Sequence, residues 1–201
     1  MGQSNTALFV FSADRPIFLR EYSTDHYTVV PYFLSKLWSE AFNTFCAMLA
    51  QALIVYWLMG FQMGFGHYLS ITYALALTST AVVVMLGALV TEAKSVSSFF
   101  TLLVVPQFYF SGLFIAIDLI PSWVRWAQYL CSMTYASRLG LAYEFENCGE
   151  PGSVAAMNCQ NVLDANDVSE DNVWWYWLAL MGLFTMFRLS GVYILRSKAN
   201  Y

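Results

Sequence analysis

The fold of this protein is decided by residues 41–91, which read AFNTFCAMLAQALIVYWLMGFQMGFGHYLSITYALALTSTAVVVMLGALVT. These 51 residues, between Glu40 and Glu92, contain no Asp, Glu, Lys or Arg. A helix of a soluble protein carries charge on its outer face. This run is apolar on both faces and long enough to cross a bilayer twice, at about 20 residues a crossing. Three glycines within residues 60–66 predict a turn, so we expect two membrane helices joined by a tight hairpin.

The composition of the whole chain favours a membrane protein. Hydrophobic residues make up 59% of the 201 residues and charged residues only 11%, against about 25% charged residues in an ordinary soluble domain. Mean hydropathy is +0.54. Aromatic residues make up 18%, which suits Trp and Tyr at two membrane interfaces. The sequence contains no basic patch, so nucleic acid is not expected as a partner.

Four stretches are apolar and long enough to be predicted as membrane spans. They cover residues 32–59, 65–91, 95–117 and 173–195. The last opens with the aromatic run WWYW at residues 174–177, which is typical of rings at the level of the lipid headgroups. The predicted fold class is therefore an all-α, polytopic membrane helix bundle with about four complete transmembrane helices.

The segments between the third and fourth spans differ from the spans in their charge. Residues 121–146 are amphipathic and too charged for a simple span, so we predict re-entrant or interfacial helices there. Residues 147–172 form a polar loop, and from Glu144 to Asn172 the chain has seven acids and no Lys or Arg. Basic residues gather instead in residues 14–40, 91–95 and 196–201. The positive-inside rule makes the basic segments and the C-terminus cytoplasmic and the loop extracellular, in a protein expected in the plasma membrane.

Residues 1–13 are typical of the end of a membrane helix whose beginning is missing. Met1–Val10 has no basic start, and no small-residue cleavage site follows a long apolar core, so a signal peptide is not predicted. We expect the chain to be a fragment or the product of a truncated gene.

Residues 14–22, which read DRPIFLREY, form a short amphipathic segment. Asp14 can cap the start of a helix. The apolar side chains of the segment can insert into the groove of a partner while its charged side chains stay in water. The apolar side chains are Ile17 and Phe18, and the charged side chains are Arg15, Arg20 and Glu21. The alternative, a solvated linker beside the membrane, stays open from these residues alone.

The four cysteines divide by environment. Cys46 and Cys131 have apolar neighbours and are expected to be packed thiols. Cys148 and Cys159 are the two cysteines of the outward loop, eleven positions apart. An oxidising exterior favours a disulfide between them. A single bridge between two chains of a dimer is the alternative.

Patterns of catalytic or metal-binding residues are absent from the sequence. His26 and His67 are far apart and have no carboxylate or Cys at ligand spacing. There is no P-loop and no nucleophile or zincin motif. We therefore expect no enzyme, no metal site and no cofactor on this chain. Arg188 is the one cation deep within a predicted span, since Lys36 lies near the wet end of the first span. Such a charge marks a functional site by default, but pairing within the bundle or snorkelling is the expected role.

The order of these parts resembles the transmembrane domain of G-subfamily ABC transporters, within the ABC-2 type permeases. The resemblance covers almost all of the 201 residues and rests on three stretches. They are residues 14–22 with 27 and 32–36, residues 110–114 with 120–123, and residues 135–145 with the Cys-bearing loop and last helix that follow. Asp14 stands where the family usually has Glu. Against the family's plan, the nucleotide-binding domain, the first span and most of the second are missing.

The resemblance implies partners that would complete a transporter. Residues 14–22 would be the coupling helix, which rests on a nucleotide-binding domain and transmits ATP-driven closure. ATP and Mg²⁺ would bind to that domain, and any ATPase activity would reside there. A second half-transporter, identical or different, would complete the permease, and residues 121–146 would roof its exit.

The resemblance also implies a route for the transported molecule. Thr101, Val105 and Phe108 would face a substrate cavity at the dimer axis, and their spacings of four and three place them on one helical face. Leu113 and Phe114 would form an apolar plug above this cavity. An apolar cavity suits hydrophobic molecules because their burial is non-directional.

The implied function is the permease part of an ATP-driven ABC exporter that works by alternating access. Its substrates would be lipids, sterols or other hydrophobic or amphipathic compounds. The alternative is a non-transporting interaction or structural protein of the membrane, or a truncated gene product. A membrane-embedded enzyme is disfavoured because the sequence shows no buried acid–base or metal pair.

Overall fold

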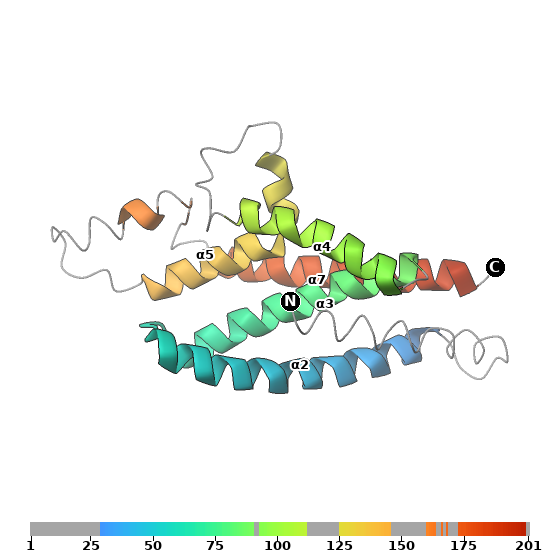
Figure 1. The fold of residues 1–201 in the computed structure, drawn as a ribbon, viewed down its shortest axis with the longest axis horizontal. Helices are drawn as coiled ribbons and strands as arrows, with labels where there is room; N and C mark the ends of the chain where they lie inside the picture. The colour runs from blue at the N-terminus through green and yellow to red at the C-terminus, as the bar shows by residue number, and fades with distance from the viewer. Residues whose placement is uncertain are drawn as a thin grey trace.

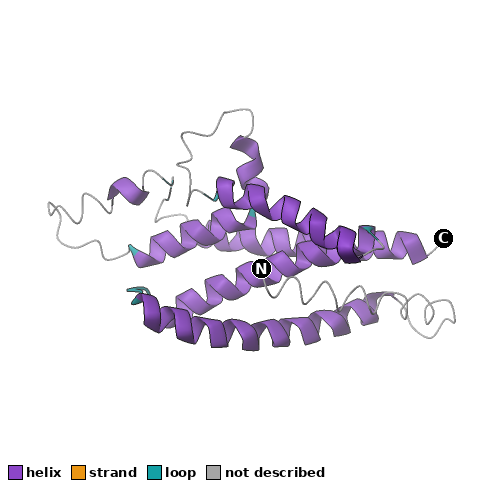
Figure 2. Cartoon of the chain, viewed as in Figure 1, coloured by secondary structure: helices purple, strands orange, loops and turns teal. Residues whose placement is uncertain are grey.

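The computed structural model describes residues 29–90, 93–111, 125–145, 160–163, 166, 168 and 173–199. These residues form helices joined by short turns and contain no strand (Figure 2). The all-α fold class predicted from the sequence is therefore confirmed.

Six helices make up most of this part of the chain (Figure 1). They are α2 (Val29–Met59), α3 (Phe65–Leu89), α4 (Ala93–Phe110), the 3₁₀ helix η2 (Arg125–Leu130), α5 (Ser132–Glu144) and α7 (Val173–Ala199). The two helices of the charge-free run, α2 and α3, lie side by side and antiparallel. The short helices η2 and α5 fall within residues 121–146, where interfacial or re-entrant helices are predicted.

Three of these helices are long and apolar enough to cross a membrane. The qualifying stretches are Leu34–Met59, Phe65–Leu89 and Val173–Ile194. In α4 the apolar stretch is shorter, Ser98–Phe110. The predicted span 95–117 continues beyond Ser111 into residues that lie outside the described part, so its full length stays a prediction.

The turn between α2 and α3 is held by a glycine and by a tyrosine hydroxyl. Gly60 follows the last residue of α2 with φ of 66°, a left-handed conformation that glycine adopts without a Cβ clash. Its N–H donates to the carbonyl of Tyr56 at 3.1 Å. The hydroxyl of Tyr56 in turn donates to the carbonyl of Met63 at 2.8 Å. The chain therefore reverses within a few residues, which keeps α2 and α3 adjacent.

Helix α3 occupies the centre of the bundle and packs against α2, α4, α5 and α7. Its second half is largely buried, and Ala81 and Ala88 have no exposed surface. Small side chains permit this because they let neighbouring helices approach closely. The hydroxyls of Thr78 and Ser79 donate to carbonyls four residues earlier in α3, at 2.8 and 2.9 Å. These two hydroxyls are thus satisfied within the helix, as an apolar environment requires.

Two clusters of buried side chains hold the bundle together. The first joins α3 to α4 and the second joins α3 to α5 and α7. The first consists of Val82, Val83, Leu86, Phe100 and Val104. The second consists of Ile71, Tyr135, Ala136, Leu139, Tyr176, Leu180 and Leu183.

The prediction that Cys46 is a packed thiol is wrong, because its side chain is exposed on α2. The outer faces of α2 are largely apolar: Trp38, Ile54 and Trp57 are also exposed, by 78%, 68% and 80%. In a helix that is long enough to span a membrane, an apolar neighbourhood is provided by lipid as readily as by protein. Apolar surroundings in the sequence therefore do not separate a packed cysteine from a lipid-facing one.

Cys131 is buried, as predicted, and is expected to resist alkylation. It lies between η2 and α5, outside the span-forming helices, and burial raises the pKa of its thiol to about 11. Since the thiolate is the nucleophile, at pH 8 only about 0.1% of such a thiol is reactive, against about a quarter of an unperturbed one of pKa about 8.5. We expect iodoacetamide to modify Cys131 more than 100-fold more slowly in the folded protein than in SDS, as measured by mass spectrometry of the Cys131 peptide. Rates within a few-fold of each other would contradict this burial.

Candidate functional site

Helix α4 carries the predicted cavity residues and has a proline inside it. Pro106 has no N–H, so the helical bond to the carbonyl of residue 102 is lost at this point. The helix continues to Phe110 nonetheless. A proline at this position is tolerated in membrane helices, where neighbouring groups compensate for the freed backbone.

The end of α4 is fixed by hydroxyl groups of α5. The last carbonyls of a helix have no partner within the helix. Here the Thr134 hydroxyl donates to the carbonyl of Phe110 at 3.0 Å, and the Ser137 hydroxyl donates to that of Ser111 at 2.8 Å. Thr134 and Ser137 are three residues apart and so lie on one face of α5. These bonds hold α5 beside the point where α4 ends.

The three predicted cavity residues have different environments within the described chain. Thr101 and Val105 are exposed, Val105 by 48%. Phe108 is half-buried and packs against the cluster that joins α3 to α4. The face of α4 that they share therefore runs from an exposed surface at Thr101 and Val105 to the packed interior at Phe108.

A small pocket lies beside Phe108, among α2, α3, α4 and α5. Its volume is about 200 Å³. Helix α4 contributes Val104, Gln107 and Phe108, and α2 contributes Met48 and Gln51. The Ser132 hydroxyl of α5 lies 3.5 Å from the side-chain carbonyl of Gln107. The pocket is thus partly polar, and Phe108 forms part of its wall.

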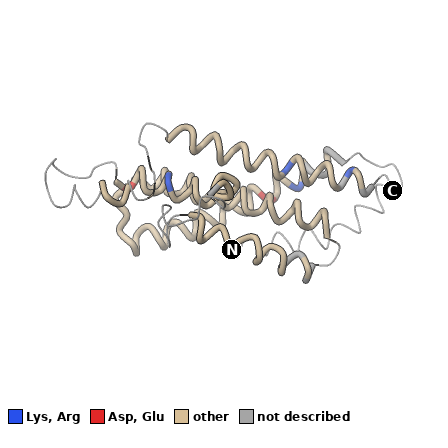
Figure 3. Tube along the Cα trace, turned by 90° about the horizontal axis from the view of Figure 1, so that it is seen from above, with Lys and Arg blue, Asp and Glu red and all other residues tan. Residues whose placement is uncertain are grey.

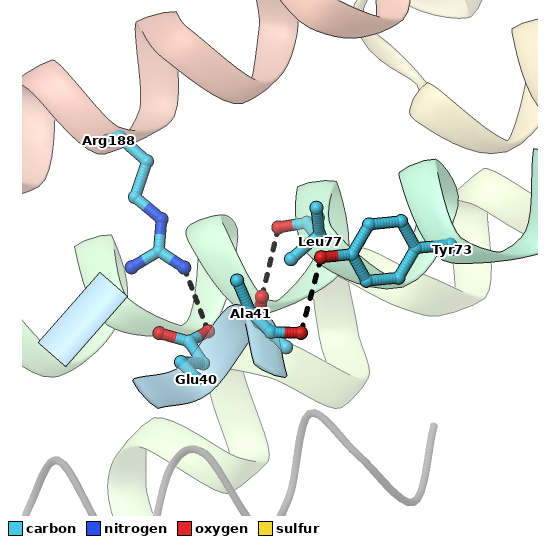
Figure 4. Close-up of polar contacts among 6 residues, drawn as sticks. Glu40, Ala41, Tyr73, Leu77 and Arg188 are labelled. Carbon is cyan, nitrogen blue, oxygen red and sulfur yellow. Dashed lines mark hydrogen bonds and ion pairs between the residues drawn. The ribbon is translucent and has the colours of Figure 1, made fainter. Parts of the chain in front are cut away.

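Arg188 forms an ion pair within the bundle, as the sequence allows. Its guanidinium on α7 lies 2.8 Å from a carboxylate oxygen of Glu40 on α2, and the two side chains are only 7% and 17% exposed. Figure 4 shows the two side chains pointing toward each other across the helices. Nearby, the Tyr73 hydroxyl of α3 donates to the carbonyl of Ala41 at 3.2 Å. Sequence reasoning identified Arg188 but missed its partner, because nothing near Glu40 signals a contact with α7.

Glu144 is a second carboxylate whose role the sequence did not show. It ends α5, and its two oxygens accept hydrogen bonds from the N–H groups of Gln62 and Met63, at 3.0 and 3.2 Å. The ring of the preceding Tyr143 stacks on His67 with centroids 4.4 Å apart. The end of α5 is therefore bound to the α2–α3 turn. The side chain of His67 is exposed, although its ring contacts that of Tyr143.

Charged residues are few along the described part of the chain (Figure 3). Lys36 lies near the start of α2 and Arg196 near the end of α7, which is the same end of the bundle. No group of three or more His, Cys, Asp or Glu that could hold a metal ion occurs among the residues that the structure describes.

Several predicted site residues lie outside the described residues, and their roles stay predictions. Those of the coupling segment are Arg15, Ile17, Phe18, Arg20 and Glu21. Those of the plug are Leu113 and Phe114, and those of the predicted disulfide are Cys148 and Cys159.

Comparison with known proteins identifies relatives among transporters. Protein scarlet of Drosophila melanogaster is 28% identical over 97% of this chain and 31% of its own length. The ABC transporter ATP-binding protein/permease wht-1 of Caenorhabditis elegans is 30% identical over 63% of this chain and 19% of its own length. ABC transporter G family member 21 of Arabidopsis thaliana is 24% identical over 95% of this chain and 29% of its own length. The chain thus spans about a third or less of the length of these relatives.

A family model agrees with these relatives and with the fold. The model described as ABC-2 type transporter matches residues 1–145, well over half of the chain. The matched region includes α2, α3, α4 and α5. This chain therefore belongs to the ABC-2 type transporter family, and its relatives include G-family ABC transporters.

Proposed function

We propose that the chain forms part of the permease of an ATP-driven ABC exporter. In this role it moves hydrophobic or amphipathic molecules, such as lipids or sterols, across the plasma membrane by alternating access. ATP and Mg²⁺ act on a partner nucleotide-binding domain, docked on residues 14–22. A second half-transporter, identical or different, completes the pathway.

One observation carries this proposal: the exposed apolar face of α4 in a member of a transporter family. Val105 is 48% exposed and Leu102 is 69% exposed. Both lie on a helix whose far end is fixed by hydrogen bonds to α5. A helix that is anchored at one end and apolar on an exposed face is suited to line a pathway between two copies. Burial against such a face is non-directional, so it accepts apolar molecules of varied shape.

The cavity role of Val105 is tested by filling the space in front of it. We expect Val105→Trp to reduce ATP-dependent transport at least ten-fold, because a large ring on the exposed face of α4 occupies the pathway. The chain would be expressed with G-family nucleotide-binding domains in cells that lack endogenous export. In inside-out vesicles made from these cells, export appears as uptake. Uptake of a fluorescent sterol or lipid would be measured with and without ATP.

Leu103→Trp is the matched control for this variant. Leu103 is also exposed, by 42%, but lies two residues away and so about 200° around the helix. The control is expected to transport normally. Equal transport by the two variants would contradict the cavity role of Val105. If vesicles with the unsubstituted chain show no transport that depends on ATP, the alternative of a non-transporting membrane protein is favoured.

A further inference from the structure

A second pocket, here named the hairpin pocket, lies between α3, α5 and the turn that joins α2 to α3. Its volume is about 290 Å³. Helix α3 lines it with Ile71 and Leu75, α5 with Ala136 and Gly140, and the turn with Phe61 and Met63. Its lining includes no residue of α4. The pocket therefore does not reach the face of α4 proposed to line the transport pathway, although Thr72, Leu75 and Met133 also line the small pocket beside Phe108.

Three polar side chains that line the hairpin pocket, those of Thr72, Ser137 and Glu144, are already bonded to the protein itself. The Thr72 hydroxyl donates to carbonyls of Tyr68 and Leu69, at 2.9 and 3.0 Å. The Ser137 hydroxyl donates to the carbonyl of Ser111, at 2.8 Å. Each Glu144 oxygen accepts an N–H of the turn. The remaining wall is almost entirely apolar, so the pocket suits hydrocarbon, whereas a polar ligand would lose its hydration there without compensation.

The hairpin pocket lies within the half of the bundle nearest the α2–α3 turn. Its α3 residues run from Tyr68 to Leu75, and Leu75 is ten residues after the helix start at Phe65. The seven residues from Tyr68 to Leu75 rise about 10 Å, which is less than one leaflet, or half, of a hydrocarbon core of about 30 Å. An acyl chain that spans one leaflet is therefore long enough to fill the pocket.

The size of the pocket selects among apolar occupants. Pockets for drug-sized ligands occupy about 300–1,000 Å³, and the hairpin pocket is at the lower limit of this range. A slender chain fits such a volume better than a broad fused-ring molecule. The surroundings of a membrane helix bundle supply such chains continuously.

We propose that the hairpin pocket binds one acyl chain of a membrane lipid from the leaflet at the hairpin end of the bundle. The hydrogen bonds of Glu144 to Gln62 and Met63 keep the turn over the end of the pocket. In this proposal the occupant is a resident lipid and not the transported molecule.

Gly140 provides a way to close the pocket. A Cβ built on Gly140 meets nothing within 4 Å, and the same holds for Gly182, which is exposed on α7. Gly140→Phe would place a ring inside the pocket, whereas Gly182→Phe would place one on the outer surface of the bundle. The two variants make the same chemical change in two helix interiors, so they form a matched pair.

The test is photolabelling of the purified chain in nanodiscs. The bilayer would be phosphatidylcholine with a small fraction carrying a diazirine halfway along one acyl chain. After irradiation, labelled peptides would be quantified by mass spectrometry, with α7 peptides as the internal reference. We expect labels to concentrate on residues 65–75 and 132–144. Gly140→Phe should lower that labelling at least five-fold, and Gly182→Phe should leave it unchanged.

Several outcomes would overturn the proposal. They are labelling of these two segments no stronger than that of α7, equal labelling in the two glycine variants, or absence of label because a second copy or another segment covers the pocket. Gel filtration and circular dichroism of each variant establish that it is folded, and Gly140→Leu replaces Gly140→Phe if the larger side chain prevents folding. The test uses no nucleotide, so its result does not depend on transport activity.

Discussion

Replacing Glu40 by glutamine is expected to destabilise the protein by about 3–5 kcal/mol, the usual cost of removing one member of a buried ion pair. The change leaves the Arg188 guanidinium in a site where it is only 7% exposed. An arginine remains charged in proteins, so it cannot relieve this cost by losing its proton. The midpoint of heat denaturation, followed by gel filtration in detergent, should fall by about 6–20 °C on the scale known for chains of this length.

Arg188→Gln, which removes the other member of the ion pair, should lower the stability less than Glu40→Gln does. This difference between the two variants makes the prediction specific. In Arg188→Gln the group left without its partner is a carboxyl, and a buried carboxyl, unlike a guanidinium, can become neutral. A double variant, Glu40→Gln with Arg188→Gln, should recover most of the lost stability, because replacing both members of a buried pair is often nearly neutral. Arg196→Gln, an exposed change on the same helix, is the control. Equal losses for Glu40→Gln and Arg196→Gln would show that the ion pair does not stabilise the bundle.

Replacing Phe18 and Arg20 together by alanine is expected to separate ATP hydrolysis from transport. If residues 14–22 dock on a nucleotide-binding domain, the loss of a buried phenyl ring removes about 1.5–3 kcal/mol of docking energy. Closure of that domain would then no longer move the permease. Transport into vesicles should fall at least ten-fold, while ATP hydrolysis, measured as phosphate release in the same vesicles, continues.

Thr24→Ala, just beyond this segment, serves as the control for expression and assembly. An unchanged ratio of molecules transported to ATP hydrolysed in the double alanine variant would remove the coupling role from Phe18 and Arg20. This outcome would return residues 14–22 to the alternative considered for them, a solvated linker beside the membrane.

The helices of this protein could be predicted from the sequence because their signal is local. A charge-free run with a cluster of glycines gives two helices and a turn, and Gly60 indeed takes the left-handed conformation that ends α2. The final helix begins at Val173, directly before the aromatic run at residues 174–177. Long apolar runs and glycine turns depend on neighbouring residues alone, so one sequence is sufficient to find them.

The neighbours of each helix could not be predicted, because lipid and protein are both apolar. Cys46 was expected to be packed and is exposed, and Val105 and Phe108 share a helical face but differ in burial. The partners of polar groups were missed for a related reason. Glu40 meets Arg188, and Glu144 meets the α2–α3 turn, only because helices far apart in the sequence adopt a particular relative rotation. That rotation is set by packing and leaves no local pattern.

The two bonds of Glu144 also have a mechanical consequence. A carboxylate that holds two N–H groups of another segment resists pulling as well as pushing, so Gln62 and Met63 travel with the end of α5. If α5 moves outward, it moves the α2–α3 turn with it and so tilts α2. With 31 residues, this helix is about 46 Å long. A displacement of the hairpin end of α2 would then be carried toward its other end by the stiffness of a single helix.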